Sequence, residues 1–282
     1  MQLTVTYVSG SGNTFTLIRE GRRRFPVTVW RQLAPQLCQW TDGLLVLGKP
    51  DGEGRVVVQF FNPDGSTGML CGNGARCAAA LLLGDKGGSV RLLFAGREVE
   101  ATVSGRNVQL RMAPPQQFPR ELSLELPAGR LRAWFADVGA PQLVVPVPEL
   151  AAIGVRRGLQ QLEVEHLGRQ LRFHAAFAPT GTNVSFYQLA PEGTVEVRTY
   201  ERGVERETQA CGTAALAVAL TAWVRDGLQP PVRVLPASRS ALLVSWEGQT
   251  PAALQALFLE GQTEVLGTDT VEVTLGEEDE WE

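Results

Sequence analysis

The chain has little of what marks a disulfide-stapled, membrane-spanning or nucleic-acid-binding protein. It has four cysteines in 282 residues, too few for a disulfide scaffold, and no apolar stretch long enough to span a bilayer. Its 26 basic and 30 acidic residues are spread along the chain, giving a formal net charge of -4 and no cationic surface suited to a nucleic-acid backbone. We therefore expect neither a membrane nor a nucleic acid as partner.

The start of the chain also lacks a charged leader followed by an apolar core, which favours a cytoplasmic location with reduced thiols. Lysine and histidine are scarce: Lys49 and Lys86 lie in glycine- or proline-rich turns, and His166 and His174 flank a short polar segment. Pyridoxal phosphate requires a Schiff-base lysine, and a zinc site requires closely spaced cysteines or histidines. We expect no cofactor and no metal.

What the sequence does have is an internal repeat. Residues 54–62 and 193–201 align without a gap, 139 positions apart, and both are glycine-led segments whose β-branched residues alternate as in a strand. Each is followed by a polar loop, a cysteine and a run rich in alanine and leucine, so that Cys71 and Cys211 occupy equivalent positions. We infer two pseudo-symmetric halves, with the active site where they meet.

The predicted fold class is α/β (α+β), each half consisting mostly of antiparallel strands wrapped around one central helix. The small-residue runs after the two cysteines lack a polar stripe, so both helices should be buried. The N-terminal half is expected to comprise residues 1–118 plus 266–282, and the C-terminal half residues 119–265. Three prolines within residues 113–119 favour a crossover there, and the last strand should return to the first half. Further alternating segments predict strands at Leu3–Val8, Leu44–Leu47, Arg91–Phe94, Glu98–Val103, Val108–Met112, Val232–Leu235, Ala241–Trp246 and Thr270–Thr274.

A cysteine at the start of a buried helix lies where backbone N–H groups and the helix dipole favour negative charge. That position lowers the thiol pKa from about 8.5 toward neutrality. One such cysteine would suit a hydrolase or a transferase. Two in facing halves suit the inversion of a stereocentre, because one thiolate removes a proton while the opposite thiol supplies another. The helix starts would also hold a substrate carboxylate.

The motifs around both cysteines resemble those of one enzyme family. The run Phe61-Asn-Pro-Asp-Gly-Ser-Thr-Gly-Met-Leu-Cys71-Gly-Asn-Gly-Ala-Arg-Cys77 is similar to the first active-site signature of diaminopimelate epimerases, and Tyr200-Glu-Arg-Gly203 with Ala210-Cys-Gly-Thr213 is similar to the second. The resemblance covers nearly the whole chain. It implies a cofactor-independent isomerase of lysine biosynthesis with an amino-acid substrate. A homodimer is compatible with this resemblance.

The resemblance also implies roles for individual residues. Cys71 and Cys211 would be the acid/base pair. The substrate's proximal carboxylate would be held by residues near the helix starts: Asn13, Gly72, Asn73, Gly212 and Thr213. Its distal amino and carboxyl groups would be held by Asn62, Asn183, Glu201 and Arg202, where Arg202 offers a planar fork to a carboxylate and Glu201 a counter-charge to an ammonium.

One departure leaves the substrate open. Where the family shows Gly-Asn-Pro-His, this chain has Ala140 and Gln142 in place of the asparagine and the histidine. Three hypotheses follow: an epimerase for LL- and meso-diaminopimelate, a racemase or epimerase for another amino acid, and a non-catalytic protein that kept the fold.

Structural roles compete with these assignments. A cysteine at a helix start is often just a small buried residue, an asparagine often a turn residue, and Glu201 with Arg202 could form a surface ion pair. The duplication favours the catalytic reading of Cys71 and Cys211. Cys77 and Cys38 have no counterpart in the repeat and are expected to be structural.

Overall fold

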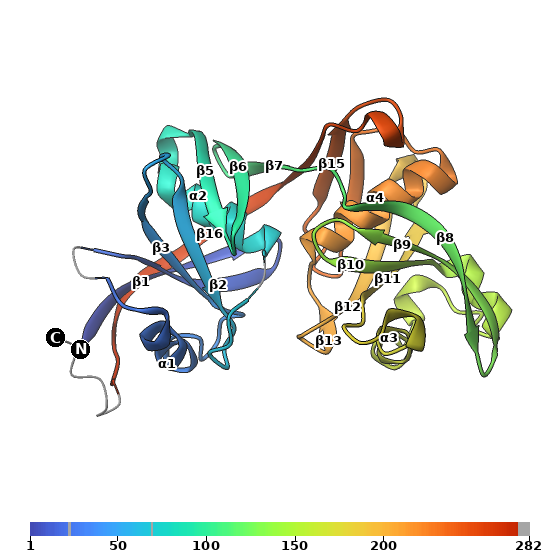
Figure 1. The fold of residues 1–282 in the computed structure, drawn as a ribbon, viewed down its shortest axis with the longest axis horizontal. Helices are drawn as coiled ribbons and strands as arrows, with labels where there is room; N and C mark the ends of the chain where they lie inside the picture. Colours follow the sequence, from blue (N-terminus) through green and yellow to red (C-terminus); the bar gives the residue numbers. More distant parts are fainter. Residues whose placement is uncertain (22–23, 69, 276–282) are drawn as a thin grey trace. The chain divides into compact units, whose positions relative to one another are not determined.

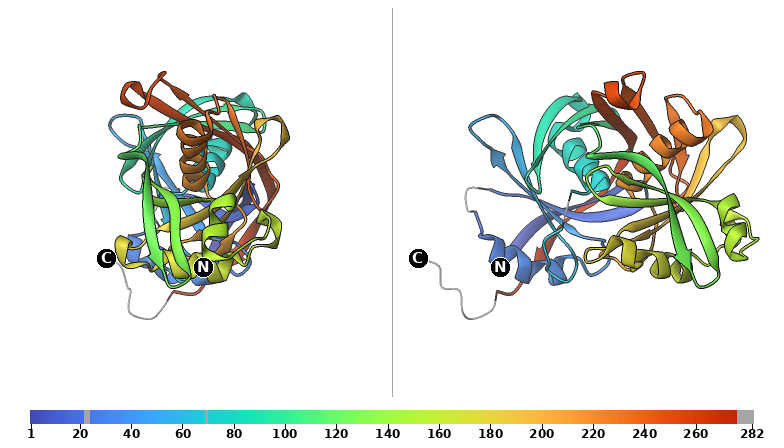
Figure 2. Two further views of the ribbon diagram at one scale, coloured as in Figure 1. Left: turned by 90° about the vertical axis from the view of Figure 1, so that its right-hand side faces the viewer. Right: turned by 45° about the vertical axis from the view of Figure 1, so that its right-hand side comes forward.

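The computed structural model describes residues 1–21, 24–68 and 70–275, so the end of the expected N-terminal half, residues 276–282, lies outside the described residues. Contacts divide the chain into two compact units: unit 1 contains Met1–Leu110 with the described part of Gly261–Glu282, and unit 2 contains Arg111–Glu260. Figures 1 and 2 show strands and helices in both units. Within the described ranges, no helix is long and apolar enough to cross a membrane.

Unit 1 is a sheet wrapped around helix α2 (Gly72–Leu83), whose first turns are fully buried (Figure 1). The strands pair in chain order from β1 to β7, and β16 (Ala256–Glu272) pairs with both β7 and β1. The sheet strands are β1 (Gln2–Gly10), β2 (Asn13–Arg19), β3 (Leu44–Pro50), β4 (Val56–Phe61), β5 (Gly88–Phe94), β6 (Arg97–Ser104) and β7 (Asn107–Met112). Helix α1 (Val27–Leu37) packs through Trp30 and Leu33 on the face of the sheet that carries Val46.

Unit 2 surrounds helix α4 (Gly212–Asp226) in the same way, and this helix is buried from Gly212 to Ala222. Its strands are β8 (Gln117–Leu126), β9 (Gly129–Asp137), β10 (Pro141–Pro146), β11 (Asn183–Leu189), β12 (Val195–Glu201), β13 (Arg206–Thr208), β14 (Val232–Leu235) and β15 (Leu242–Glu247). Strand β16 begins here, beside β15, and ends in unit 1. The returning last strand that the sequence predicts is therefore present, but much longer than Thr270–Thr274.

The duplication inferred from the sequence reappears in the strand pairing. In unit 1, β2–β3 is parallel, β3–β4 antiparallel and β4–β5 parallel. In unit 2, β10–β11 is parallel, β11–β12 antiparallel and β12–β14 parallel. The strands before the two cysteines, β4 and β12, thus occupy equivalent places. The parallel pairs were not expected, because alternation of residues does not reveal strand direction.

One local prediction needs correction, and one helix was not predicted. The segment 113–119 is not wholly a crossover, because Phe118 and Pro119 belong to β8. Pro119 is tolerated there because β8 is the last strand of the sheet and its register with β9 shifts between Gln117 and Arg120.

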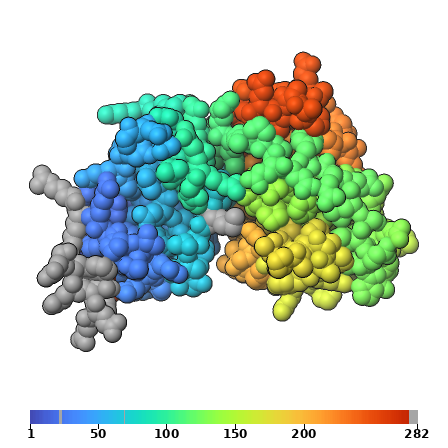
Figure 3. Space-filling view, in the orientation of Figure 1, coloured from blue at the N-terminus to red at the C-terminus, as the bar shows by residue number. Residues whose placement is uncertain are grey.

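Helix α3 (Val164–Arg172) was missed and carries His166, although Val164, Leu167 and Leu171 have helical spacing. Figure 3 shows β8 and β9 (green) and α3 (yellow) on the face of unit 2 turned to the viewer.

Candidate functional site

Cys71 is the N-cap residue of α2, with an extended backbone and a half-buried side chain. Its carbonyl oxygen accepts the first helical hydrogen bond from Ala75 N at 2.8 Å, and its Sγ accepts one from Gly74 N at 3.4 Å. A sulfur atom that accepts from a helix N-terminus is stabilised as a thiolate. The structure thus places Cys71 at the start of a buried helix, as the sequence predicts.

Two predicted binding residues meet beside this helix start. Asn73 is 2% exposed, and its Nδ2 donates to Asn13 Oδ1 at 2.7 Å. Asn13 Nδ2 in turn donates to Asp42 Oδ2 at 3.4 Å, and the same carboxylate oxygen accepts from Thr14 N at 2.9 Å. The amides of Asn13 and Asn73 therefore form one connected chain that ends on a carboxylate.

Asn62 lies in a tight turn after β4. Its carbonyl accepts from Gly65 N at 2.9 Å, and its Nδ2 donates to Ser66 Oγ at 2.8 Å. Gly65 has φ +82°, and a Cβ at that position would be 2.3 Å from Arg31 O of α1. Only glycine fits this contact, so α1 fixes the turn. Asn62 has the turn role that the sequence allowed, and its half-buried side chain is hydrogen-bonded to Ser66 within the same turn.

Cys211 is the N-cap residue of α4 and matches Cys71 in its extended backbone and its half-buried side chain. Its Sγ lies 3.4 Å from Thr213 Oγ1. Thr213 Oγ1 also accepts a hydrogen bond from Gln142 Nε2 at 2.8 Å. Gln142 is fully buried on β10, and its Oε1 has no hydrogen-bond partner among the described residues. The residue regarded as a departure from the family pattern therefore connects to Cys211 through Thr213.

The other predicted residues of unit 2 gather at the end of β12. Asn183 Oδ1 accepts from Arg202 N at 2.8 Å, and Asn183 Nδ2 donates to Pro141 O at 3.0 Å. Glu201 Oε2 accepts from Thr208 Oγ1 at 2.8 Å across the β12–β13 pair. Asn183 is 4% exposed, whereas Glu201 and Arg202 are half-buried. Asn183 thus holds the backbone of Arg202 in place.

The remaining cysteines are buried, as predicted. Cys77 is fully buried, and burial raises its pKa to about 12. Cys38 is 5% exposed, and burial raises its pKa to about 11, opposed by a hydrogen bond with Thr41. Both are therefore neutral thiols at physiological pH. Among the described residues, no group of three histidine, cysteine or acidic side chains is arranged to hold a metal ion.

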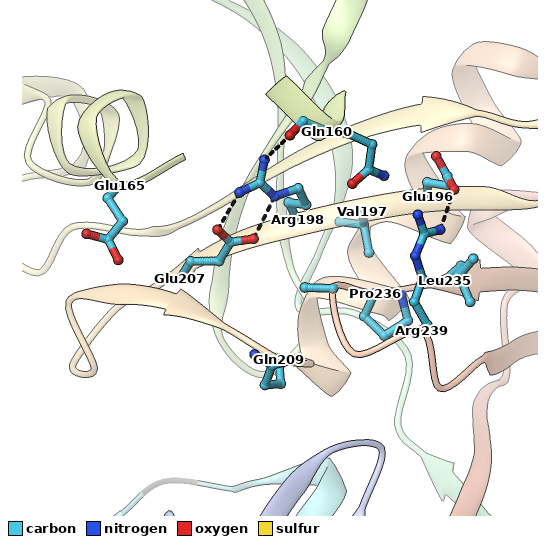
Figure 4. A pocket seen from close by; sticks show the side chains of 11 residues that line it. Gln160, Glu165, Glu196, Val197, Arg198, Glu207, Gln209, Leu235, Pro236 and Arg239 are labelled. Carbon is cyan, nitrogen blue, oxygen red and sulfur yellow. Dashed lines mark hydrogen bonds and ion pairs between the residues drawn. The ribbon is translucent and has the colours of Figure 1, made fainter. Parts of the chain in front are cut away.

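Unit 2 also contains a polar pocket of about 450 Å³, and Gln209 at its rim precedes Ala210 and Cys211 (Figure 4). Its two arginines are paired with acidic side chains: Arg198 Nη2 lies 2.6 Å from Glu207 Oε2, and Arg239 Nη1 lies 2.6 Å from Glu196 Oε1. Arg198 also donates to backbone carbonyls, including that of Leu159 at 3.0 Å. These ion pairs satisfy the cations within the pocket, and we assign it no ligand.

The sequence analysis proposed roles for both cysteines and for residues around them, but it assigned nothing to Arg76. Arg76 is fully buried inside α2, next to Ala75 and Cys77. A signal for it existed, since a charged residue interrupts an otherwise apolar helical run and arginine is almost never fully buried without a partner.

Sequence comparison finds diaminopimelate epimerases. A sequence model described as diaminopimelate epimerase matches residues 134–255. A diaminopimelate epimerase of Aquifex aeolicus (strain VF5) is 35% identical over 271 residues, which cover 90% of this chain and 92% of that protein. A diaminopimelate epimerase of Hydrogenobaculum sp. (strain Y04AAS1) is 31% identical over 280 residues, covering 93% and 95%.

Solved structures share the fold. A hydroxyproline epimerase from Agrobacterium vitis superposes with a TM-score of 0.71 at 18% identity, covering 96% of this chain and 91% of that one. A phenazine biosynthesis protein of the PhzF family from Bacillus anthracis gives a TM-score of 0.71 at 12% identity, covering 97% and 100%. At these identities the likeness concerns the fold, and it confirms the predicted fold class.

Proposed function

Because this chain belongs to the diaminopimelate epimerase family of isomerases, we propose that it interconverts LL- and meso-diaminopimelate by a cofactor-independent exchange of one α-proton between two cysteines. In this proposal, the thiolate of Cys71 or Cys211 removes the α-proton from one face of the carbon. The thiol of the other cysteine protonates the opposite face, and the roles exchange in the reverse direction.

The observation that carries the proposal is the equivalence of the two cysteines. Each caps a buried helix at the same place in a duplicated unit, and the Sγ of Cys71 accepts a hydrogen bond from a backbone N–H group in the first turn of its helix. Such N–H groups favour a thiolate, and they also favour a substrate carboxylate whose charge grows as the α-proton leaves. Asn13, Gly72 and Asn73 in unit 1, with Gly212 and Thr213 in unit 2, are assigned to that carboxylate.

The distal end of the substrate is assigned to Asn62, Asn183, Glu201 and Arg202. Arg202 suits a carboxylate and Glu201 an ammonium, which together match a molecule with a second amino-acid end. No cofactor is needed in this scheme, and Lys49 and Lys86, the side chains that a Schiff base would require, are exposed. Both thiols must stay reduced, so we also propose a cytoplasmic location.

The test is to follow LL-diaminopimelate by chiral chromatography with purified, reduced protein and no added cofactor. The proposal predicts conversion to the meso isomer until an equilibrium mixture forms. Dialysis against a metal chelator should leave the rate unchanged. No conversion by a folded, reduced preparation would remove the substrate assignment.

A second candidate is a racemase or epimerase for another amino acid with the same chemistry. It is favoured by Ala140 and Gln142, which replace two polar residues of the family pattern. A screen of amino acids for deuterium uptake from heavy water separates the candidates. Exchange with diaminopimelate at a higher kcat/KM than with any other amino acid would exclude this alternative.

A further inference from the structure

Arg76 is a buried cation without a counter-ion in the part of the chain that the structure describes. Its side chain is fully buried, and its Nη2 donates to Ser11 Oγ at 2.7 Å and to Asn73 Oδ1 at 2.9 Å. Nε and Nη1 are buried and make no hydrogen bond to any described residue. Burying a charge with unsatisfied N–H groups is costly, and such a group in a native structure calls for an explanation.

The fold itself does not need this cation. In the repeat, the fifth residue after Cys71 is Arg76, and the fifth residue after Cys211 is Leu216. Leu216 is also fully buried and lies in the same turn of its helix. Because the same architecture accommodates leucine at this position, the arginine serves something other than helix packing.

Arg76 is connected to the binding residues of unit 1. Its Nη2 occupies Asn73 Oδ1, so the Asn73 amide donates from Nδ2 to Asn13 Oδ1, and Asn13 donates from Nδ2 toward Asp42. The side-chain oxygens of Asn73 and Asn13 each accept one of these bonds, which fixes which way both amides point. A cation at one end and a carboxylate at the other polarise the chain in one direction.

Other charges around α2 do not neutralise Arg76. The charged side chains on the strands that contact α2 are exposed or half-buried: Arg19, Lys49, Arg91, Arg97, Glu98 and Glu100. Asp85 and Lys86, directly after the helix, are exposed, and Tyr7 of β1 is half-buried. Cys77 is a buried thiol, and the carboxylate of Asp42 is connected to Arg76 through the two asparagines.

We propose that Arg76 is a positioning residue whose buried charge keeps Cys71 ionised and whose bond to Asn73 orients the Asn73–Asn13 amides toward a substrate carboxylate. The effect on Cys71 is a property of the protein alone. The effect on the carboxylate rests on the proposed function.

The electrostatics agree with this geometry. Burial lowers the pKa of Arg76, and attraction to the thiolate forms of Cys77 and Cys71 opposes that shift. A guanidinium nevertheless stays protonated in proteins, so its charge acts on its neighbours. Because burial raises the pKa of Cys77 to about 12, Cys77 stays neutral near pH 7, and Cys71 at the start of the same helix is the thiol on which we propose that the charge acts.

The experiment measures the pH dependence of alkylation of each cysteine by iodoacetamide, read peptide by peptide by mass spectrometry. Two variants remove the charge: Arg76→Leu imports the residue of the equivalent position, and Arg76→Gln keeps donors for Asn73 and Ser11, which favours folding. We expect the Cys71 midpoint to rise by about one pH unit in both, so that Cys71 reacts about tenfold more slowly at pH 7. Cys211 is the internal control and should keep its midpoint.

Arg76→Lys is the conservative variant and should restore most of the Cys71 reactivity, because it keeps a positive charge. A purely structural role would lower the melting temperature of Arg76→Leu and Arg76→Gln without moving the Cys71 midpoint. An unchanged Cys71 midpoint in either folded charge-removing variant would overturn the proposal. Since no substrate is present, this result is independent of whether diaminopimelate is turned over.

Discussion

Gln142 and Thr213 are joined by a hydrogen bond of 2.8 Å in which the amide Nε2 donates to the threonine hydroxyl. With its oxygen accepting from Gln142, the Thr213 hydroxyl can direct its own proton to Cys211 Sγ at 3.4 Å. A hydrogen bond donated to a thiolate favours the charged form and lowers the thiol pKa. A residue of β10 thereby acts on a cysteine of α4.

Gln142→Leu and Thr213→Val should therefore both raise the alkylation midpoint of Cys211 and leave that of Cys71 unchanged. Each should slow the reaction of Cys211 at pH 7 about fivefold, the effect of losing roughly 1 kcal/mol from one hydrogen bond. Because the two residues act in series, the double variant should be no slower than the slower single variant. Additive effects would show that Gln142 does not act through Thr213.

Serine in place of either proposed catalytic cysteine should reduce the epimerisation rate by at least about a hundredfold, because a hydroxyl is a far weaker acid than a thiol. Steady-state rates of Cys71→Ser and Cys211→Ser with LL-diaminopimelate provide the measurement. Cys38→Ala is the matched control, since Cys38 packs in the core beside Trp30 and Leu33 of α1, and it should retain activity. Retained activity in either serine variant would contradict the assignment.

Arg202→Lys should raise KM about tenfold and change kcat much less, because the proposed contact is with the non-reacting end of the substrate and lysine cannot form a bidentate pair. Arg206→Lys, an exposed change in the adjacent β13, should leave both constants unaltered. A larger loss in kcat than in KM would place Arg202 at the reacting carbon instead.

Gly168→Ala should destabilise the protein even though alanine is the better helix former by about 1 kcal/mol. A Cβ at Gly168 of α3 would lie 2.4 Å from Tyr200 Cβ, so helix and strand would have to separate. Overpacking of this kind costs about 1–3 kcal/mol, and thermal denaturation should show a lower melting temperature. His166→Ala, on the exposed side of the same helix, should melt at the temperature of the original protein.

Glu149 should stabilise the fold in a pH-dependent way. Hydrogen bonds and attraction from Arg132 and Arg225, at 2.7 and 2.9 Å, hold the pKa of Glu149 below its ordinary value. A depressed folded-state pKa gives stability that is present above the unfolded pKa of about 4.3 and is lost as the pH falls through the folded value.

Glu149→Gln should accordingly lower the melting temperature at pH 7, and the difference should shrink toward pH 3. The exposed pair Arg157–Glu163 provides the control, because a surface ion pair contributes little, and Glu163→Gln should change the melting temperature at neither pH. An equal loss at both pH values would mean that Glu149 acts through packing rather than charge.

The sequence predicted the features that depend on local pattern and on the repeat. The two cysteines at helix starts, the burial of both helices and the strands before them follow from periodicity and self-similarity. The contacts that tune the site do not follow in this way. Gln142 lies 71 residues from Thr213 in the chain, and its place depends on the parallel register that sets it opposite Asn183.

Arg76 shows the same limit of prediction from sequence. Its position within an apolar helix was visible in the sequence, but its bond to Ser11 depends on how β1 and α2 pack. Likewise, Gly168 reveals its role only through the close approach of Tyr200. Long-range packing decides such contacts, and a single sequence does not encode it in a readable pattern.

The most direct test of the central claim follows deuterium during the first few per cent of LL-diaminopimelate conversion in heavy water. A thiol carries one proton, so the cysteine that removes the substrate proton can return only that proton, while the opposite cysteine delivers deuterium. The account predicts deuterium at the α-carbon of the newly formed meso isomer and none in the remaining LL isomer. Equal early labelling of both isomers would mean that a single base serves both faces, and the two-cysteine account would be wrong.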